Sequence, residues 1–337
     1  MGRVEYRGRG DNERSFGRRG VEQLMPASDV RVGFIGCGEH AGEVLLPAVR
    51  QAGMDLAAIC DLDKRRAQRA TRRFGAFRAY QDLQRMVHEM DLDAVLVCGP
   101  PELHAEAATV ALQHGCHVWT EAPPAPTAAE AERIGDLARE RGLVAQAGLM
   151  MRFAPVYRRL QATLTDEAFG APVAFEATYW PPALPGHDEP LLFDALHVLD
   201  LVRWLLGEVA ECSITRADDR AAISLRMLDG ATGVVSFLRG GPWPRELVTI
   251  GSADAVATAQ DRASLTVRRR DRDQMTVWRA DALAAGGQTD TAQLRGYLPA
   301  LVQFAAGAAD NAPQEATISD AAATMRLIER LHRDGEV

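Results

Sequence analysis

From Val30 onward, short apolar runs alternate with stretches in which apolar residues recur every three or four positions. The runs VRVGFIG, DLAAICD, DAVLVCG, CHVWTE and LVAQAGL have the length and composition of buried strands. The stretches between them, such as HAGEVLLPAVRQAG and ELHAEAATVALQHG, have helical spacing. Strands that alternate with helices predict βαβ units with right-handed crossovers and a parallel sheet. This part of the chain ends near Gly148.

The pattern changes in the second half of the chain. Strand-like runs now follow one another, and several are joined by short turns such as LDGA and RDRD. The runs are PVAFEATYW, VAECSITRA, AAISLRML, ATGVVSFLR, ELVTIGS, DAVATAQ, ASLTVRRR and QMTVWRA. Such a series predicts a large, mostly antiparallel sheet with one face packed on helices. We expect those helices near 153–168, at 193–206 and near 295–332.

The periodicity divides the chain into three parts. Residues 1–29 lack periodicity and are rich in Arg and Gly, so we expect a disordered tail there. Residues 30–148 form the expected α/β domain with a doubly wound parallel sheet. Residues 149–337 form a second α/β domain with an open sheet, which we expect to carry the substrate site and the oligomer contacts.

Composition and charge argue against several classes of function. The chain has 337 residues, of which 47% are apolar and 25% charged, which is normal for a globular protein. The net charge of -8 argues against a nucleic-acid surface, and no run approaches the roughly 18 apolar residues of a membrane span. The 5 cysteines form no CxxC pair, which favours reduced thiols in the cytoplasm. The histidines and cysteines show no metal-ligand spacing, so no metal site is expected.

The first strand-to-helix turn reads GCGEHA, a G-x-G-x-x-A motif at residues 36–41. Gly36 permits a tight turn, Gly38 lets the backbone approach a pyrophosphate, and Ala41 allows close packing of helix on strand. The helix N-terminus then meets the negative charge of the phosphates. A glycine turn that only caps a helix is the alternative, but the strand-turn-helix context predicts a dinucleotide site in a Rossmann fold.

Asp61 ends the second strand, 20 residues after Ala41. An acid at this place can accept a hydrogen bond from the ribose 2′-hydroxyl of NAD and would repel the 2′-phosphate of NADP. Lys64, Arg65 and Arg66 follow and could offset that phosphate, or they are the solvated start of a helix. We therefore expect NAD, with NADP as the alternative.

From these residues onward the chain resembles the Gfo/Idh/MocA family, named after glucose–fructose oxidoreductase, inositol dehydrogenase and a rhizopine-catabolism protein. Five segments match in order: GFIGCGEHA, LDAVLVCGPPELHAEAATVALQHGCHVWTEAP, GLMMRFAP, DALHVLDLVRWLLGE and DAAATMRLIERLHRDG. The resemblance covers residues 30–337. It implies a Rossmann domain, a second domain with an open sheet, a nicotinamide in the cleft, and homodimers or homotetramers formed through the sheets.

Two departures from the family pattern fall on residues that carry chemistry. The fifth strand of similar proteins usually ends Glu-Lys-Pro, and the lysine helps to position the substrate and to transfer a proton; here the lysine position is Ala122. Lys64 is the only lysine in the chain, so no other lysine takes that role. In the substrate-site helix, His197 aligns with the family's histidine, but the aspartate position is Phe193. Asp194 is three residues before His197, and residues three apart share a helix face.

The resemblance and the motif together name the candidate site. The expected catalytic residues are His197 and Asp194, although a core histidine bonded to Asp200 or Asp194 and a plain helix cap at Asp194 are the alternatives. The expected cofactor-binding residues are Gly36, Cys37, Gly38, Glu39, His40, Ala41, Asp61, Lys64, Gly99, Pro100, His104 and Glu121. The alternative for His104 is a position on the surface of its helix. The alternative for Glu121 is an acid at the end of a strand that binds no ligand.

The expected substrate-binding residues lie on both sides of the cleft. Ala122 lies beside the reacting atoms, and Arg152 lies at the domain interface, where a salt bridge is the alternative to an anionic substrate. The Pro-rich segment YWPPALPGHDEP at 179–190 is a candidate lid that carries Tyr179 and His187; an ordinary connection is the alternative.

The leading hypothesis is an NAD(P)-dependent oxidoreductase that acts on an imine, or on a keto or hydroxyl group of a sugar-like or cyclic molecule. An iminium carbon is already cationic, so such a substrate would tolerate Ala122, and some similar imine reductases also lack the lysine. The second hypothesis is a non-catalytic NAD(P)-binding regulator or scaffold. The third is an enzyme that retains NAD and performs a redox-neutral elimination or glycoside cleavage.

Overall fold

The computed structural model of this chain describes most of the residues after the expected tail. The described residues are 30–180, 191–217, 220–238, 244–272, 274–280, 291–310, 312 and 314–334. The expected tail, most of the Pro-rich segment and His187 therefore lie outside the described residues.

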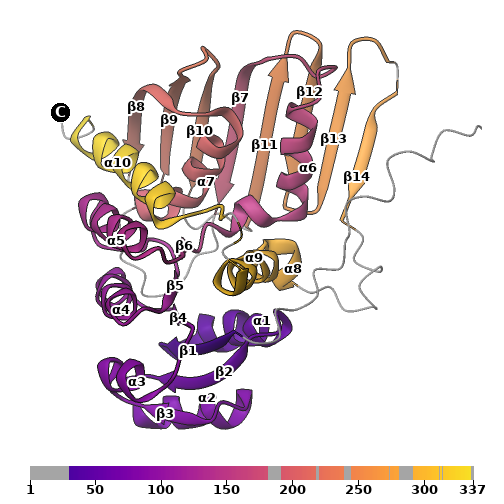
Figure 1. The fold of residues 1–337 in the computed structure, drawn as a ribbon. Coiled ribbons are helices and arrows are strands. Elements are labelled where there is room, and N and C mark those ends of the chain that lie inside the picture. Colours follow the sequence, from indigo (N-terminus) through magenta and orange to yellow (C-terminus); the bar gives the residue numbers. More distant parts are fainter. Residues whose placement is uncertain are drawn as a thin grey trace, which may run out of the picture.

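The first half of the chain forms a six-stranded parallel sheet, drawn in indigo to magenta in Figure 1. Its strands are β1 (Arg31–Ile35), β2 (Asp55–Cys60), β3 (Arg78–Tyr80), β4 (Ala94–Val97), β5 (His117–Thr120) and β6 (Ala145–Ala147). Their order is β3-β2-β1-β4-β5-β6, with every neighbouring pair parallel. This is the strand order of a doubly wound dinucleotide-binding sheet, so the predicted fold class is confirmed.

The helices of this half begin and end where local chemistry predicts. They are α1 (Leu46–Gln51), α2 (Lys64–Phe74), α3 (Leu83–Glu89), α4 (Pro101–Gln113) and α5 (Ala128–Arg141). The Asp63 carboxylate accepts from the N–H groups of Arg65 and Arg66 at the start of α2. Helix α2 ends at Gly75, whose φ of 74° belongs to the left-handed region that glycine adopts without strain.

The first predicted helix is divided into two pieces. Residues Ala41–Leu45 form a π-helical turn (η1), in which the Leu46 N–H donates to the Ala41 carbonyl five residues back. Pro47 follows and has no N–H, so it cannot donate the α-helical bond to the carbonyl of Glu43. Single π turns of this kind are frequent at functional sites, and this one begins at Ala41, the last residue of the glycine motif.

The second half forms an eight-stranded sheet, and all eight predicted strands are present. They are β7 (Pro172–Trp180), β8 (Val209–Ala217), β9 (Arg220–Met227), β10 (Thr232–Leu238), β11 (Arg245–Ser252), β12 (Ala255–Gln260), β13 (Ser264–Arg269) and β14 (Thr276–Arg279). The order is β14-β13-β12-β11-β7-β10-β9-β8. Among the described strand pairs of this sheet, β7 and β10 are parallel and the others are antiparallel. Strands β8, β9 and β10 form a meander whose last strand lies beside β7.

Helices cover one face of this sheet, as the alternation of its strands predicts. The remaining helices are a 3₁₀ turn η2 (Met150–Phe153), α6 (Pro155–Leu164), α7 (Leu191–Leu206), α8 (Thr291–Arg295), α9 (Tyr297–Asp310) and α10 (Ile318–Asp334). Helix α6 packs on β12 and β13, α7 on β7, β9 and β10, and α10 on β8 (Figure 1). In β9, Ile223 and Leu225 are buried against these helices while Ser224 between them is exposed.

The two sheets are joined through helices that lie between them. Helix α9 packs on α1 of the first half and on η2, and α10 packs on α5 (Figure 1). Gln146 in β6 also forms a backbone bridge with Thr317, just before α10. The C-terminal part of the chain thus closes over the edge of the first sheet. In the described part of the chain, no helix is both long and apolar enough to cross a membrane.

Candidate functional site

The glycine turn after β1 leaves room for a ligand. Gly36 has a φ of 91°, and a Cβ at this position would lie 1.9 Å from the Cys98 carbonyl oxygen. The turn can therefore pass this close to the end of β4 only with glycine. A Cβ at Gly38 would meet no atom within 4 Å, so the backbone of Gly38 borders open space. A phosphate fits such a turn, because the N–H groups at the start of the following helix point into it.

Asp61 at the end of β2 holds the glycine turn in place. Its carboxylate accepts a 2.7 Å hydrogen bond from the Cys37 N–H and a 2.8 Å bond from the Asp63 N–H. The Asp61 carboxylate thus points toward the glycine turn, where we expect the adenosine ribose to lie. Lys64 begins α2 and is exposed, which is the solvated helix start that the sequence also allowed.

His104 connects the ends of β4 and β5. Its Nε2 accepts from the Gly99 N–H at 3.0 Å, so Nδ1 carries the proton and donates to the Pro123 carbonyl at 2.7 Å. Burial lowers the pKa of His104, which agrees with this neutral form. The side chain is 1% exposed, so the alternative of a surface position is wrong. Both ring nitrogens bind the backbone, and His104 therefore fixes the loops that border the cofactor turn, including Gly99 and Pro100.

Glu121, at the end of β5, forms the charged centre of the site. Its Oε1 lies 2.8 Å from Nε2 of His40, and its Oε2 accepts from the Ala122 N–H at 3.2 Å. The His40 ring also packs edge-on against Tyr297 of α9, with 5.4 Å between ring centroids. The glycine motif, β5 and α9 are thereby brought together, although they are far apart in the sequence.

The protonation of this pair follows from its surroundings. Burial alone would raise the pKa of Glu121, but the hydrogen bond and charge of His40 and the charge of His197 outweigh it, so the pKa is lowered. Burial alone would lower the pKa of His40, but the Glu121 hydrogen bond and charge outweigh it, so the pKa is raised. Glu121 is thus held as a carboxylate, and His40 is held as an imidazolium to a higher pH than usual.

His197 lies in α7 close enough to Glu121 for its charge to act on that carboxylate. The side chain is half-buried, between the fully buried neighbours Leu196 and Val198. Ala122 follows Glu121 directly and is also half-buried. Asp194 belongs to the same helix, but its side chain lies outside what the structure describes.

Arg152 forms the salt bridge that was the alternative to a substrate contact. Its Nε and Nη2 donate to the two oxygens of Asp200 at 2.8 and 2.6 Å, and Nη1 lies 3.6 Å from Asp320. Thr324 adds a 3.1 Å bond to Asp200. This buried network ties η2, α7 and α10 together behind the site, and it explains the position of Arg152 without a ligand.

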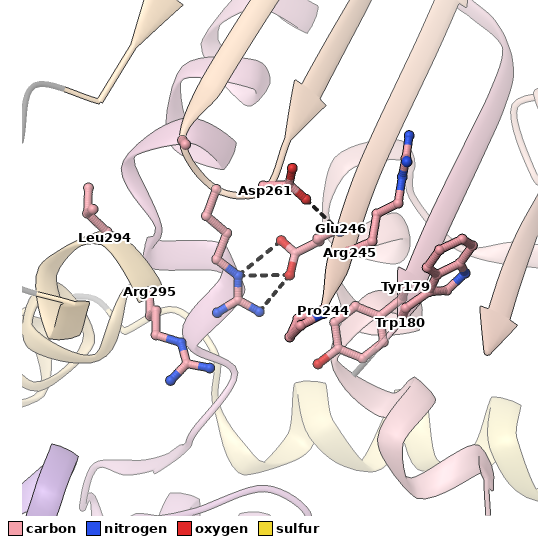
Figure 2. A pocket seen from close by; sticks show the side chains of 10 residues that line it. Tyr179, Trp180, Pro244, Arg245, Glu246, Asp261, Leu294 and Arg295 are labelled. Atoms are coloured by element: carbon pink, nitrogen blue, oxygen red, sulfur yellow. Dashed lines mark hydrogen bonds and ion pairs between the residues drawn. The ribbon is translucent and has the colours of Figure 1, made fainter. Parts of the chain in front are cut away.

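Tyr179 lines a cavity of about 280 Å³ at the end of the second sheet. Figure 2 shows side chains that line it. The cavity is bordered by β7, β11, the β12–β13 turn and α8. The sequence reading did not identify Tyr297, Arg295 and the residues of this turn, because no motif marks them. Among the described residues, no group of three or more His, Cys, Asp or Glu side chains could hold a metal ion.

The Glu121–His40 pair gives a direct test of the site's electrostatics. In Glu121→Gln we expect the pKa of His40 to fall below its usual value of about 6.5, because burial then acts without the carboxylate. In the wild type the pair stabilises the fold most where both groups are charged. This contribution is lost as the pH rises through the raised pKa of His40 and as it falls through the lowered pKa of Glu121.

NMR titration of the histidine rings measures this pKa, with His40→Gln identifying the resonance. Glu102→Gln is the control, because Glu102 is an exposed acid at the start of α4; it should leave the pKa of His40 near the wild-type value. An unchanged pKa of His40 in Glu121→Gln would mean that the pair does not exist in solution.

Comparison with known proteins agrees with this geometry. Residues 30–149 match the model of a family described as "Oxidoreductase family, NAD-binding Rossmann fold". The chain is 32% identical over 193 residues to inositol 2-dehydrogenase 4 of Saccharopolyspora erythraea, covering 55% of this chain and 56% of that protein. It is 30% identical over 207 residues to D-glucoside 3-dehydrogenase of Escherichia coli, covering 58% of this chain and 59% of that protein. The matches thus span a little over half the length of these relatives.

A solved structure extends the similarity along most of the chain. A dehydrogenase from Chromobacterium violaceum superposes with a TM-score of 0.81 and 26% identity, covering 91% of this chain and 96% of the other. Both halves of the fold therefore have a counterpart in that dehydrogenase.

Proposed function

Because the chain belongs to the Gfo/Idh/MocA oxidoreductase family, we propose that it is an NAD(P)-dependent oxidoreductase that acts on a small sugar-like molecule. The observation that carries the proposal is the cluster at the end of β5. There Glu121 and His40 lie directly beside a glycine turn with open space at Gly38, and the charge of His197 reaches Glu121. Ligands of doubly wound sheets bind at this edge, at the carboxyl ends of the strands.

The residues at the glycine turn fit a dinucleotide. The turn at Gly36–Ala41 would hold the pyrophosphate, and Asp61 would accept from a ribose hydroxyl while it holds the Cys37 N–H. The carboxylate of Asp61 would repel a 2′-phosphate, so we propose NAD rather than NADP. When bound, the nicotinamide accepts or gives the hydride.

The protein must accept or supply the proton that accompanies the hydride. We assign this step to the imidazole of His197, because Ala122 has no titratable group and Lys64 lies at the start of α2, beside the adenosine end of the proposed site. Asp194 is the proposed partner of His197 on the same helix. The carboxylate of Glu121 favours a positive charge nearby, which would stabilise His197 when it takes up the proton.

A second candidate substrate is favoured by Ala122. An imine is protonated before reduction and is already cationic, so its carbon needs no lysine beside it. The D-glucoside and inositol dehydrogenases among the relatives act on hydroxyl-rich rings, and a keto or hydroxyl group of such a ring is our first choice. Reduction of cyclic imines in preference to keto-sugars would establish the second candidate instead.

Cofactor titration tests the proposal first. Binding is measured from the fluorescence of NADH and of NADPH as the protein is added. Turnover is then measured from the consumption of each cofactor with panels of keto-sugars and imines. We expect tighter binding of NADH, and turnover with at least one panel. Tighter binding of NADPH would overturn the NAD assignment. Binding without turnover across both panels would favour a regulatory NAD-binding protein, and turnover without net NADH change would favour a redox-neutral reaction.

The open face of the second sheet supports a homo-oligomer. This face lies opposite α6, α7 and α10 and carries short side chains, among them Ser224, Thr249 and Thr258. Val234 and Val256 on the same face are 36% and 45% exposed. The same face also carries charged side chains, among them Glu176 and Arg226. A sheet face on which exposed valines alternate with polar groups is suited to pairing with a second copy. Light scattering measures the mass in solution, and the mass of one chain, 36.6 kDa, would contradict this proposal.

A further inference from the structure

The Glu121–His40 pair lies where the second half of a bound dinucleotide would lie. The strand order of the first sheet reverses between β1 and β4, and a dinucleotide crosses a doubly wound sheet at this point. Asp61, directly after β2, is the proposed contact of the adenosine half. The nicotinamide half then lies on the other side of the crossing, at the ends of β4 and β5, where Glu121 directly follows Thr120.

One side chain of the pair is fixed and the other is open to solvent. The Glu121 side chain is 11% exposed and that of His40 is 42% exposed, with 2.8 Å between Oε1 and Nε2. The Glu121 N–H donates to the Val97 carbonyl at 3.0 Å, and a Cβ at Gly148 would lie 2.6 Å from Oε2. The carboxylate is therefore held against the ends of β4 and β6, while the imidazole can exchange its proton with solvent.

Several groups face the pair from other elements, and most of those described keep one charge near neutral pH. Burial and the charge of the pair's carboxylate raise the pKa of Tyr297 in α9 and that of the Cys98 thiol after β4, so both stay neutral. Burial lowers the pKa of His104 in α4, whose ring is bonded to the backbone. Arg295 of α8 is always charged, and its charge acts on the imidazole of the pair.

Two imidazoles among the described residues act on the Glu121 carboxylate. His40 is bonded to it, and the charge of His197 in α7 reaches it. Glu39 and Glu43, on the same segment as His40, are exposed, where solvent and salt screen their charge. A change of charge at Glu121 near neutral pH therefore comes from His40 or from His197, and variants of each distinguish the two.

The two oxidation states of a nicotinamide cofactor differ in charge at the ring that would meet the pair. The ring is positive in NAD⁺ and neutral in NADH. While His40 is protonated, the pair has no net charge and attracts a positive ring only weakly. Once His40 is neutral, the carboxylate of Glu121 is left alone and attracts that ring. For unit charges several ångströms apart at a partly exposed site, this attraction corresponds to about a threefold to tenfold change in affinity.

We propose that the Glu121–His40 pair couples one proton to the oxidation state of the bound cofactor, so that NADH is favoured while His40 is an imidazolium and NAD⁺ is favoured once His40 is neutral. This inference rests on the proposed oxidoreductase function, because it requires a nicotinamide at the end of β5. The affinity for NAD⁺ relative to NADH rises as the pH increases through the pKa of His40, which is raised above its usual value of about 6.5. Reciprocally, NAD⁺ lowers the pKa of His40 more than NADH does.

Competition binding to the full chain measures the ratio of the Kd for NAD⁺ to the Kd for NADH from about pH 6 to about pH 9, at constant ionic strength. NADH is followed by its fluorescence, and NAD⁺ by its displacement of NADH. In the wild type the ratio should fall about threefold to tenfold as the pH rises. His40→Gln should keep the ratio low at every pH, and Glu121→Gln should keep it high. A purely structural role would weaken both cofactors alike.

Two further histidine variants are the controls. His197→Gln removes the other imidazole that acts on Glu121 and should keep the pH dependence. His114→Gln removes an exposed imidazole at the far end of α4, at the opposite edge of the sheet, and should behave like the wild type. A pH dependence that survives in His40→Gln, or that disappears in His197→Gln, would overturn the proposal.

The binding data also separate this inference from the proposed function. Binding of both cofactors with a ratio that does not change with pH removes this inference and leaves the oxidoreductase proposal intact. Binding of neither cofactor removes both. If NADPH binds more tightly than NADH, the same ratio is measured with NADP⁺ and NADPH, because the nicotinamide ring is the same. NMR titration of the His40 ring with each cofactor gives an independent measure, since the two pKa values should differ by the logarithm of the same factor.

Discussion

Replacement of Asp200 by alanine is expected to lower the free energy of unfolding by about 3–5 kcal/mol, the usual effect of removing one partner from a buried ion pair. Asp200 is 1% exposed and accepts both bonds of the Arg152 fork and one from Thr324. Without it, the contact that the described residues leave to the buried guanidinium of Arg152 is the longer one of 3.6 Å to Asp320. Urea unfolding followed by circular dichroism measures the change.

A double variant separates the ion pair from the packing around it. In Arg152→Met with Asp200→Leu, apolar side chains replace both charges, and such replacements are close to neutral when the volume is conserved. We expect it to be far more stable than Asp200→Ala. A loss below about 1 kcal/mol in Asp200→Ala, as for an exposed pair, would show that the network does not hold η2, α7 and α10 together.

Replacement of His197 by glutamine is expected to reduce kcat by about 10²–10⁴-fold, the range of general acid–base catalysis. Glutamine retains a polar side chain in α7 but cannot exchange a proton near neutral pH. Because the proposed role of His197 is confined to the proton step, the affinity for NADH should stay close to the wild-type value. Steady-state kinetics with the best substrate of the panels, together with NADH titration, measures both quantities.

The control for this variant is His88→Gln. His88 is exposed at the end of α3, and its ring lies edge-on to that of His114, with 6.4 Å between ring centroids. It should leave kcat unchanged. A kcat of His197→Gln within tenfold of the wild type would remove His197 from the proton step. Loss of NADH binding together with kcat would show a structural role instead.

The helices and strands were largely predictable, because residues that are buried on one face of a helix or strand recur at a regular spacing in the sequence. The strands β1, β2, β4 and β5 appear as short apolar runs, and β9 appears as a strict alternation. The break of the first helix was not predicted. The π turn depends on hydrogen bonds between Ala41 and Leu46 and on the missing N–H of Pro47, which a hydrophobic pattern does not register.

The candidate site was predictable only in part. The glycine motif and Asp61 are local signals, and the structure joins them through the bond from the Cys37 N–H to Asp61. For His104 the sequence allows a place at the cofactor site or on the surface; the structure excludes the surface and shows the ring bonded to Gly99 and Pro123. A single sequence cannot distinguish these roles, since they depend on which backbone atoms from other loops reach the ring.

The sequence by itself determined the alternation of strands and helices, the glycine turn, the acid after β2 and the alanine after Glu121. These features are local, because period and turn chemistry act between near neighbours in the chain. Only the tertiary structure decided that His40 pairs with Glu121, that Arg152 pairs with Asp200, and that Tyr179, Arg262 and Arg295 line one cavity. Such contacts join segments far apart in sequence, and their partners follow from the packing of the two sheets and the helices between them.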